Sequence, residues 1–179
     1  MFSLFLKIFK TPDNVVFLSN NEINQKAVLT TLKELESKIK KLFHGSLAIR
    51  QIDSGSDNAT EQELVALSNS FYDIERFGIH FVASPRHADM LLITGPLTRN
   101  MVKAVKRTYE ATPSPKVVVT VGDDAENGGI WQGSYAISDG VNNILPVHYH
   151  IPGDPPSPIV ILSSLLKILQ TVESKTLKS

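Results

Sequence analysis

Apolar residues between Ile23 and Leu42 recur mostly every three or four positions, which is the spacing of one buried helix face. Ser19-Asn20-Asn21-Glu22 precedes them with the spacing of a capping box, so a helix is predicted to begin there. Gly45 follows the last apolar position and is expected to end the helix. The pattern therefore predicts an amphipathic helix ahead of the main domain.

After Gly45, short apolar runs alternate with segments of helical spacing. The strands are predicted at residues 46–52, 78–83, 90–94, 117–121 and 145–151. The helices are predicted at residues 61–71, from Thr98 to about 110, and from a cap at Ser157 and Pro158 through 159–169. Residues 123–140 read as one long loop. This alternation predicts an α/β fold with a mostly parallel sheet and helices on both faces.

The two ends of the chain differ from this central part. Met1 to Lys10 is strongly apolar but contains Lys7, so we expect an interfacial helix or a segment packed on a neighbouring subunit. No apolar run reaches the roughly 18 to 20 residues needed to span a bilayer. We divide the chain into N-terminal docking helices at 1–44, an α/β domain at 45–172 and a polar tail at 173–179.

The amino-acid composition argues against a nucleic-acid partner and excludes every site that needs cysteine. The 179 residues include 18 Lys and Arg against 18 Asp and Glu, so nothing favours a nucleic-acid partner. The chain has no Cys, which excludes disulfides, Cys nucleophiles and iron–sulfur clusters held by its own thiolates.

Three aspartates follow predicted strands. Asp57 comes after the first strand, Asp124 after the strand at 117–121, and Asp154 after the last strand. Because ligands of parallel α/β sheets bind at the carboxyl ends of the strands, these acids are expected near one another. They could form a solvated surface or one paired with a partner, a divalent-cation site with Glu61 and Asp123 as spare ligands, or a proton-handling cluster.

Several longer motifs carry a resemblance. They are Gly55-Ser56-x-Asn58-x-x-Glu61, residues 72–89, residues 94–101, Arg107-Thr108-Tyr109-Glu110-Ala111, Val121-Gly122-Asp123 and Ile151-Pro152-Gly153-x-Pro155-Pro156. From Ser46 to about Leu169 the chain resembles the cluster-bearing small subunit shared by respiratory complex I, the NADH:quinone oxidoreductase, and by membrane-bound, energy-converting [NiFe] hydrogenases. The resemblance implies a flavodoxin-like α/β fold.

The resemblance also identifies what this chain lacks. In that family the terminal [4Fe–4S] cluster is held by Cys at the positions of Asp57, Thr60, Asp124 and Asp154. Oxygen side chains prefer hard ions such as Mg²⁺ or Ca²⁺, whereas these clusters are held mainly by thiolates. We therefore expect no iron–sulfur cluster, and no other cofactor, in this chain.

The implied function is that of a docking subunit, on the cytoplasmic side of a membrane complex. Its implied partners are a hydrogenase-large-subunit-like or complex I 49-kDa-like chain, a ferredoxin-like subunit and membrane-arm subunits, without nucleic acid. Candidate counter-ions or partner contacts are Arg50, Arg76, Arg86, Arg99, Trp131 and Tyr135. The alternatives are the carboxylate site, electron transfer through clusters on partner chains, and a flavin- or nucleotide-binding protein.

Overall fold

The computed structural model describes residues 25–176, so the apolar segment at 1–10 and the capping box at 19–22 lie outside the described residues. Helix α2 (Gln25–Phe43) is the amphipathic helix predicted before the domain. It buries Val28, Leu32, Leu35 and Ile39, at intervals of three and four residues. The helix ends before Gly45, as predicted.

A five-stranded sheet with the order β2-β1-β3-β4-β5 forms the centre of the molecule. The strands are β1 (Leu47–Asp53), β2 (Ile79–Phe81), β3 (Met90–Thr94), β4 (Val117–Val121) and β5 (Tyr149–Ile151). Every neighbouring pair is parallel, which confirms the α/β class and the flavodoxin-like order. Consequently all five strands end at the same edge of the sheet.

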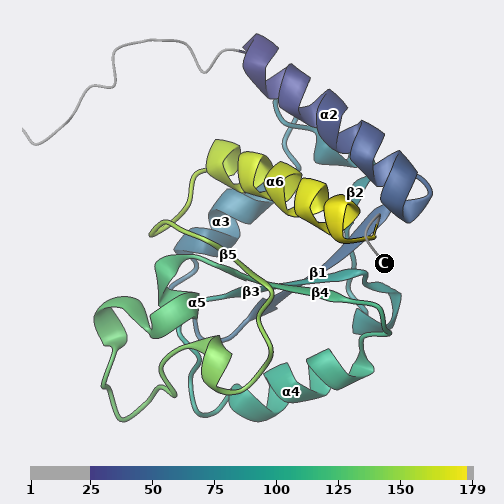
Figure 1. Cartoon of the computed structure of the whole chain (residues 1–179). Coiled ribbons are helices and arrows are strands. Elements are labelled where there is room, and N and C mark those ends of the chain that lie inside the picture. Colours follow the sequence, from purple (N-terminus) through teal and green to yellow (C-terminus); the bar gives the residue numbers. More distant parts are fainter. Residues whose placement is uncertain (1–24, 177–179) are drawn as a thin grey trace, which may run out of the picture.

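The helices cover both faces of this sheet (Figure 1). On one face lie α2, α3 (Ala59–Ala66) and α6 (Pro158–Thr176), and α4 (Val102–Ala111) lies on the other. A short helix, α5 (Asp123–Asn127), follows β4. The 3₁₀ helices are η1 (Ile74–Phe77), η2 (Pro85–His87), η3 (Gly129–Trp131) and η4 (Val141–Asn143).

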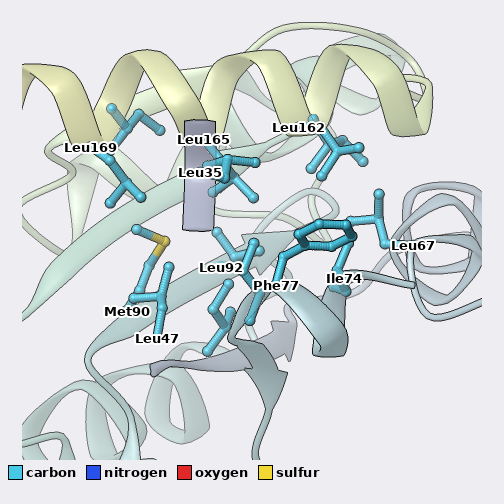
Figure 2. Close-up of a cluster of buried hydrophobic side chains, with 14 of the residues drawn as sticks. Leu35, Leu47, Leu67, Ile74, Phe77, Met90, Leu92, Leu162, Leu165 and Leu169 are labelled. Atoms are coloured by element: carbon cyan, nitrogen blue, oxygen red, sulfur yellow. The ribbon is translucent and has the colours of Figure 1, made fainter. Parts of the chain in front are cut away.

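The larger core lies between the sheet and the layer formed by α2 and α6. Figure 2 shows Leu35 of α2 and Leu165 of α6 pointing toward Leu92 of the sheet. All three side chains are almost completely buried. A smaller core around Leu91 and Val105 fills the space between the sheet and α4.

Glu173 joins the two helices of the α2–α6 layer. Its carboxylate accepts hydrogen bonds from the ammonium groups of Lys38 and Lys41 on α2. These hydrogen bonds hold the pKa of Glu173 below its ordinary value. Helix α6 continues to Thr176. Glu173 therefore lies on a helix, within the segment that was predicted to be a polar tail.

Several element boundaries differ from the predictions. The helix predicted at 61–71 starts two residues earlier and ends at Ala66, and only residues 149–151 of the last predicted strand pair with β4. The helix predicted from Thr98 begins at Val102, because the Thr98 hydroxyl donates to Ser54 O at 2.9 Å instead of capping it. The predicted loop at 123–140 opens with α5.

Candidate functional site

The carboxyl ends of β1, β4 and β5 meet at one corner of the sheet. Thr60, in the first turn of α3, is buried there and lies against Gly122, the residue that follows β4. A Cβ atom added to Gly122 would be 3.1 Å from Thr60 Oγ1 and 3.5 Å from Gly153 O. Segments separated by more than 30 residues are therefore in contact at the position where the sequence predicted a shared site.

Hydrogen bonds within the loop after β1 fix its shape. Asp53 Oδ1 accepts from the N–H groups of Gly55 and Ser56, both at 2.8 Å. The Ser56 hydroxyl and the Thr94 hydroxyl donate to the two carboxylate oxygens of Glu61. Glu61 thus connects α3 to the ends of β1 and β3, and each of its carboxylate oxygens accepts one hydrogen bond within the chain.

A reciprocal pair of hydrogen bonds joins α5 to the turn after β5. Asp123 N–H donates to Gly153 O at 2.9 Å, and Gly153 N–H donates to Asp123 Oδ1 at 2.9 Å. Asp124 and Asp154 are the next residues along each segment, and Asp154 is exposed. This pairing fixes both segments at the same corner.

Asp124 has the most unusual environment of the acids at this corner. Its Oδ1 atom is buried and has no hydrogen-bond partner. Burial raises the pKa of the Asp124 carboxyl, and the negative charges of Asp154, Asp57 and Asp123 raise it further. Because the charges of Asp57 and Asp154 act on Asp124, the three predicted aspartates lie in one neighbourhood of the structure.

Gly129 leaves room for the Asp124 side chain. A Cβ atom at position 129 would be 1.6 Å from Asp124 Oδ1, and Gly129 has a φ of +51°. A larger residue would therefore have to displace the carboxyl group as well as adopt an unfavourable backbone conformation.

The acids do not assemble into a metal centre. Among residues 25–176, no three His, Cys, Asp or Glu side chains are arranged so that they could hold a metal ion. Asp57 Oδ1 instead accepts from the Ala59 N–H group at 2.9 Å, which turns it toward its own loop. The corner is therefore an acidic neighbourhood in which Asp57 and Asp123 accept hydrogen bonds from nearby backbone groups, whereas Asp124 Oδ1 has no partner.

The four arginines proposed as counter-ions do not pair with these acids in the described part of the chain. Arg76 lies 6.0 Å from the centre of the Phe77 ring, and Arg86 is exposed. Arg99 Nε donates to Ile137 O at 3.3 Å. Arg50 lines a pocket beside β1.

The segment after α5 presents large apolar side chains to solvent. Trp131 is 50% exposed and Tyr135 is 85% exposed, as expected of partner contacts. Ile130 is 81% exposed and was not predicted, because a single isoleucine in a loop carries no periodic pattern.

The structure also brings His150 to this corner, which the sequence did not predict. His150 Nδ1 lies 3.0 Å from Thr120 Oγ1, and His150 Nε2 lies 3.5 Å from Asp123 Oδ1 and 3.3 Å from Glu126 Oε2. Only the pairing of β5 with β4 brings these residues together, so sequence spacing could not have identified the contact.

Residues 58–168 match the family model described as the NADH ubiquinone oxidoreductase 20-kDa subunit. The chain is also 40% identical over 141 residues to the probable membrane-bound hydrogenase subunit mbhJ of Pyrococcus furiosus, covering 77% of this chain and 84% of that protein. The chain belongs to the 20-kDa-subunit family. The resemblance inferred from the motifs is thereby confirmed.

Two further proteins similar to this 20-kDa-subunit family member are a subunit of an enzyme and a chain of a membrane complex. It is 35% identical to formate hydrogenlyase subunit 7 of Escherichia coli, over 81% of this chain and 57% of that protein. A chain of the archaeal membrane-bound sulfane sulfur reductase superposes with a TM-score of 0.65 and 32% identity, over 79% of this chain and 76% of the other.

A more distant structure agrees in fold alone. A chain of an NAD⁺-reducing [NiFe]-hydrogenase superposes with a TM-score of 0.55 at 17% identity, covering 70% of this chain and 92% of that chain.

The side chains of this 20-kDa-subunit family member do not suit the family's [4Fe–4S] cluster. The positions where the resemblance places cluster ligands hold Asp57, Thr60, Asp124 and Asp154, and the chain has no Cys that could replace them. The backbone nevertheless brings α3, α5 and the turn after β5 to one corner. At the positions that the resemblance assigns to cluster ligands, this corner therefore offers oxygen atoms in place of sulfur.

Proposed function

We propose that this chain is a docking subunit, without a [4Fe–4S] cluster of its own, of a membrane-associated complex resembling energy-converting hydrogenases or complex I. One observation carries the proposal: the four positions that the resemblance assigns to cluster ligands hold Asp57, Thr60, Asp124 and Asp154 instead of Cys, although the segments that carry them meet at one corner. A subunit retained for electron transfer would need those thiolates, whereas one retained for assembly needs only the fold and its surfaces.

The proposed partners follow from the family and from the surfaces. Membership of the 20-kDa-subunit family supports three kinds of partner: a hydrogenase-large-subunit-like or 49-kDa-like chain, a ferredoxin-like subunit and membrane-arm subunits. The exposed side chains of Ile130, Trp131 and Tyr135, beside the acidic corner, support the large subunit as their partner. No helix in residues 25–176 is long and apolar enough to cross a membrane. We propose a peripheral position on the cytoplasmic side.

Isolation of the native assembly tests this function. An affinity tag on the full chain in its own organism is expected to recover a stoichiometric hydrogenase-large-subunit homologue together with membrane subunits, identified by mass spectrometry. Recovery of the chain alone, from membranes solubilised gently enough to keep other complexes intact, would contradict docking.

Iron analysis tests the cluster. After reconstitution with iron and sulfide, the purified chain is expected to bind no stoichiometric iron. The matched variant restores thiolates through Asp57→Cys, Thr60→Cys, Asp124→Cys and Asp154→Cys, and it is expected to bind a cluster if the corner has kept its shape. A paramagnetic signal from the reduced wild-type chain would refute the proposal.

A second candidate function, proton handling at the acidic corner, is favoured by the raised pKa of Asp124. Its divalent-metal version receives no such support from the geometry of residues 25–176. Replacement of Asp57, Asp124 and Asp154 together by Asn is expected to reduce proton coupling of the assembled complex while leaving assembly intact. Unchanged coupling in the triple variant would eliminate this candidate.

A further inference from the structure

A pocket of about 350 Å³ lies between β1, α3 and the chain that leaves β2. It exists because β2 pairs with β1 only as far as Ile49, whereas β3 follows β1 to Asp53. On the β2 side, the residues of β1 after Ile49 therefore have α3 beside them instead of another strand. Apolar side chains form most of the pocket wall, including Leu64, Val65 and Phe81.

Arg50 brings an unpaired positive charge to this pocket. Its side chain lines the pocket, and its Nε atom is buried without a hydrogen-bond partner. No carboxylate in residues 25–176 forms an ion pair with its guanidinium group. A guanidinium stays charged at all physiological pH values, and a buried donor left unpaired costs about 1–3 kcal/mol. Arg50 therefore lacks an acceptor within the described residues.

The acid that lines the same pocket does not fill this role. Glu61 accepts hydrogen bonds from the hydroxyl groups of Ser56 and Thr94, one on each carboxylate oxygen. Gln51, another polar residue of the wall, already donates to Thr94 Oγ1 at 3.1 Å. Arg50 is thus the polar group of the pocket whose partner must come from outside the described chain.

We infer that the pocket receives an acidic side chain of the partner large subunit, whose carboxylate accepts hydrogen bonds from Arg50. The inference deepens the proposed function and rests on it. Val65 is 71% exposed at the pocket, so apolar surface continues outward beyond the cavity. A docked polypeptide covers that surface with the residues flanking its acid, whereas a small free carboxylate leaves it in water.

Binding of the hydrogenase-large-subunit homologue from the same genome tests the inference, with the full chain and biolayer interferometry. Arg50→Met, which removes the charge but keeps the length, is expected to weaken binding about 10- to 100-fold. Arg50→Lys is expected to restore part of the loss, and Arg107→Met, at an exposed arginine of α4 on the opposite face of the sheet, is expected to bind like wild type. Equal binding by Arg50→Met and wild type overturns this inference and leaves docking intact.

A measurement on the unaltered chain covers the case in which the variants misfold. Pentanoate is expected to shift the Nε–H nuclear magnetic resonance signal of Arg50, whereas neutral pentanamide is not. Triple-resonance experiments on the wild-type chain assign the signal by linking it to the backbone of Arg50. An unmoved signal in saturating pentanoate overturns the inference. If wild-type chain binds no large subunit at all, the proposed function fails first and the inference falls with it.

Discussion

Asp124 keeps one carboxyl oxygen buried beside three other acids, although nothing in its sequence context distinguishes it from them. The motif places it at the end of β4, and that much could be predicted from the resemblance. Its burial could not, because it depends on Gly129 folding back over the side chain. Asp57 and Asp154 are exposed, whereas at Asp124 burial adds to charge repulsion in raising the pKa.

The raised pKa of Asp124 has a consequence for stability. Between the ordinary carboxyl pKa and the raised one, the folded state binds the proton more tightly, so stability falls as pH rises through this window. Asp124→Asn removes this penalty. We expect the variant to melt above wild type near neutral pH, and thermal unfolding followed by circular dichroism measures the difference.

The pH dependence of the melting temperature tests whether the Asp124 carboxyl causes this difference. Below pH 3.8, the ordinary value for this carboxyl, Asp124 is protonated in both the folded and the unfolded state, so the two proteins are expected to melt together. Glu110→Gln, at an exposed position on α4, is the control and is expected to change little. A variant less stable than wild type near neutral pH would mean that the ionised carboxyl is stabilised by contacts within the chain.

At the level of elements, α2 is part of the main core and not an appendage to it. Leu35 is fully buried beside side chains of α6 and the sheet (Figure 2). Leu35→Ala is expected to lower the free energy of unfolding by about 2–5 kcal/mol, because the removed side chain leaves a cavity. Urea unfolding followed by circular dichroism measures the change.

The matched control lies on the same helix. Leu29 is 46% exposed, so Leu29→Ala is expected to cost about 0.5 kcal/mol or less. If both variants lose an equally small amount of the free energy of unfolding, α2 does not unfold together with the α/β domain. A single shared transition, with a large loss only for Leu35→Ala, would assign the helix to the same cooperative unit.

The sequence predicted some elements to the residue and misplaced others for identifiable reasons. Continuous apolar runs define β3 and β4, whose predicted bounds agree with the structure. The start of α4 was misplaced because Thr98 has the composition of a cap but donates its hydroxyl to the loop after β1. Such a contact joins segments more than 40 residues apart, and no local pattern contains it.

At the level of the whole molecule, the exposed aromatic side chains belong to the same corner as the acids. Trp131 is the only tryptophan of the chain and is half exposed, so its fluorescence reports directly on this surface. Binding of the large subunit is expected to shift its emission to shorter wavelength. Trp131→Ala is expected to weaken that binding by about 2 kcal/mol without changing the melting temperature.

Leu29→Ala, on the distant α2 helix, is the control for large-subunit binding and is expected to bind like wild type. Emission from Trp131 that stays unchanged in a complex shown to form by size-exclusion chromatography would remove this segment from the docking surface. The partner would then have to contact another face of the α/β domain.

The pairing of α2 with α6 also determines when the protein can finish folding. These are the first and last helices of residues 25–176, and they lie side by side, joined by Lys38 and Glu173 (Figure 1). During synthesis α2 leaves the ribosome long before α6 exists, so the apolar side chains of α2 have no partner helix until α6 has been made. The nascent chain therefore exposes a surface suited to chaperones until α6 is synthesised.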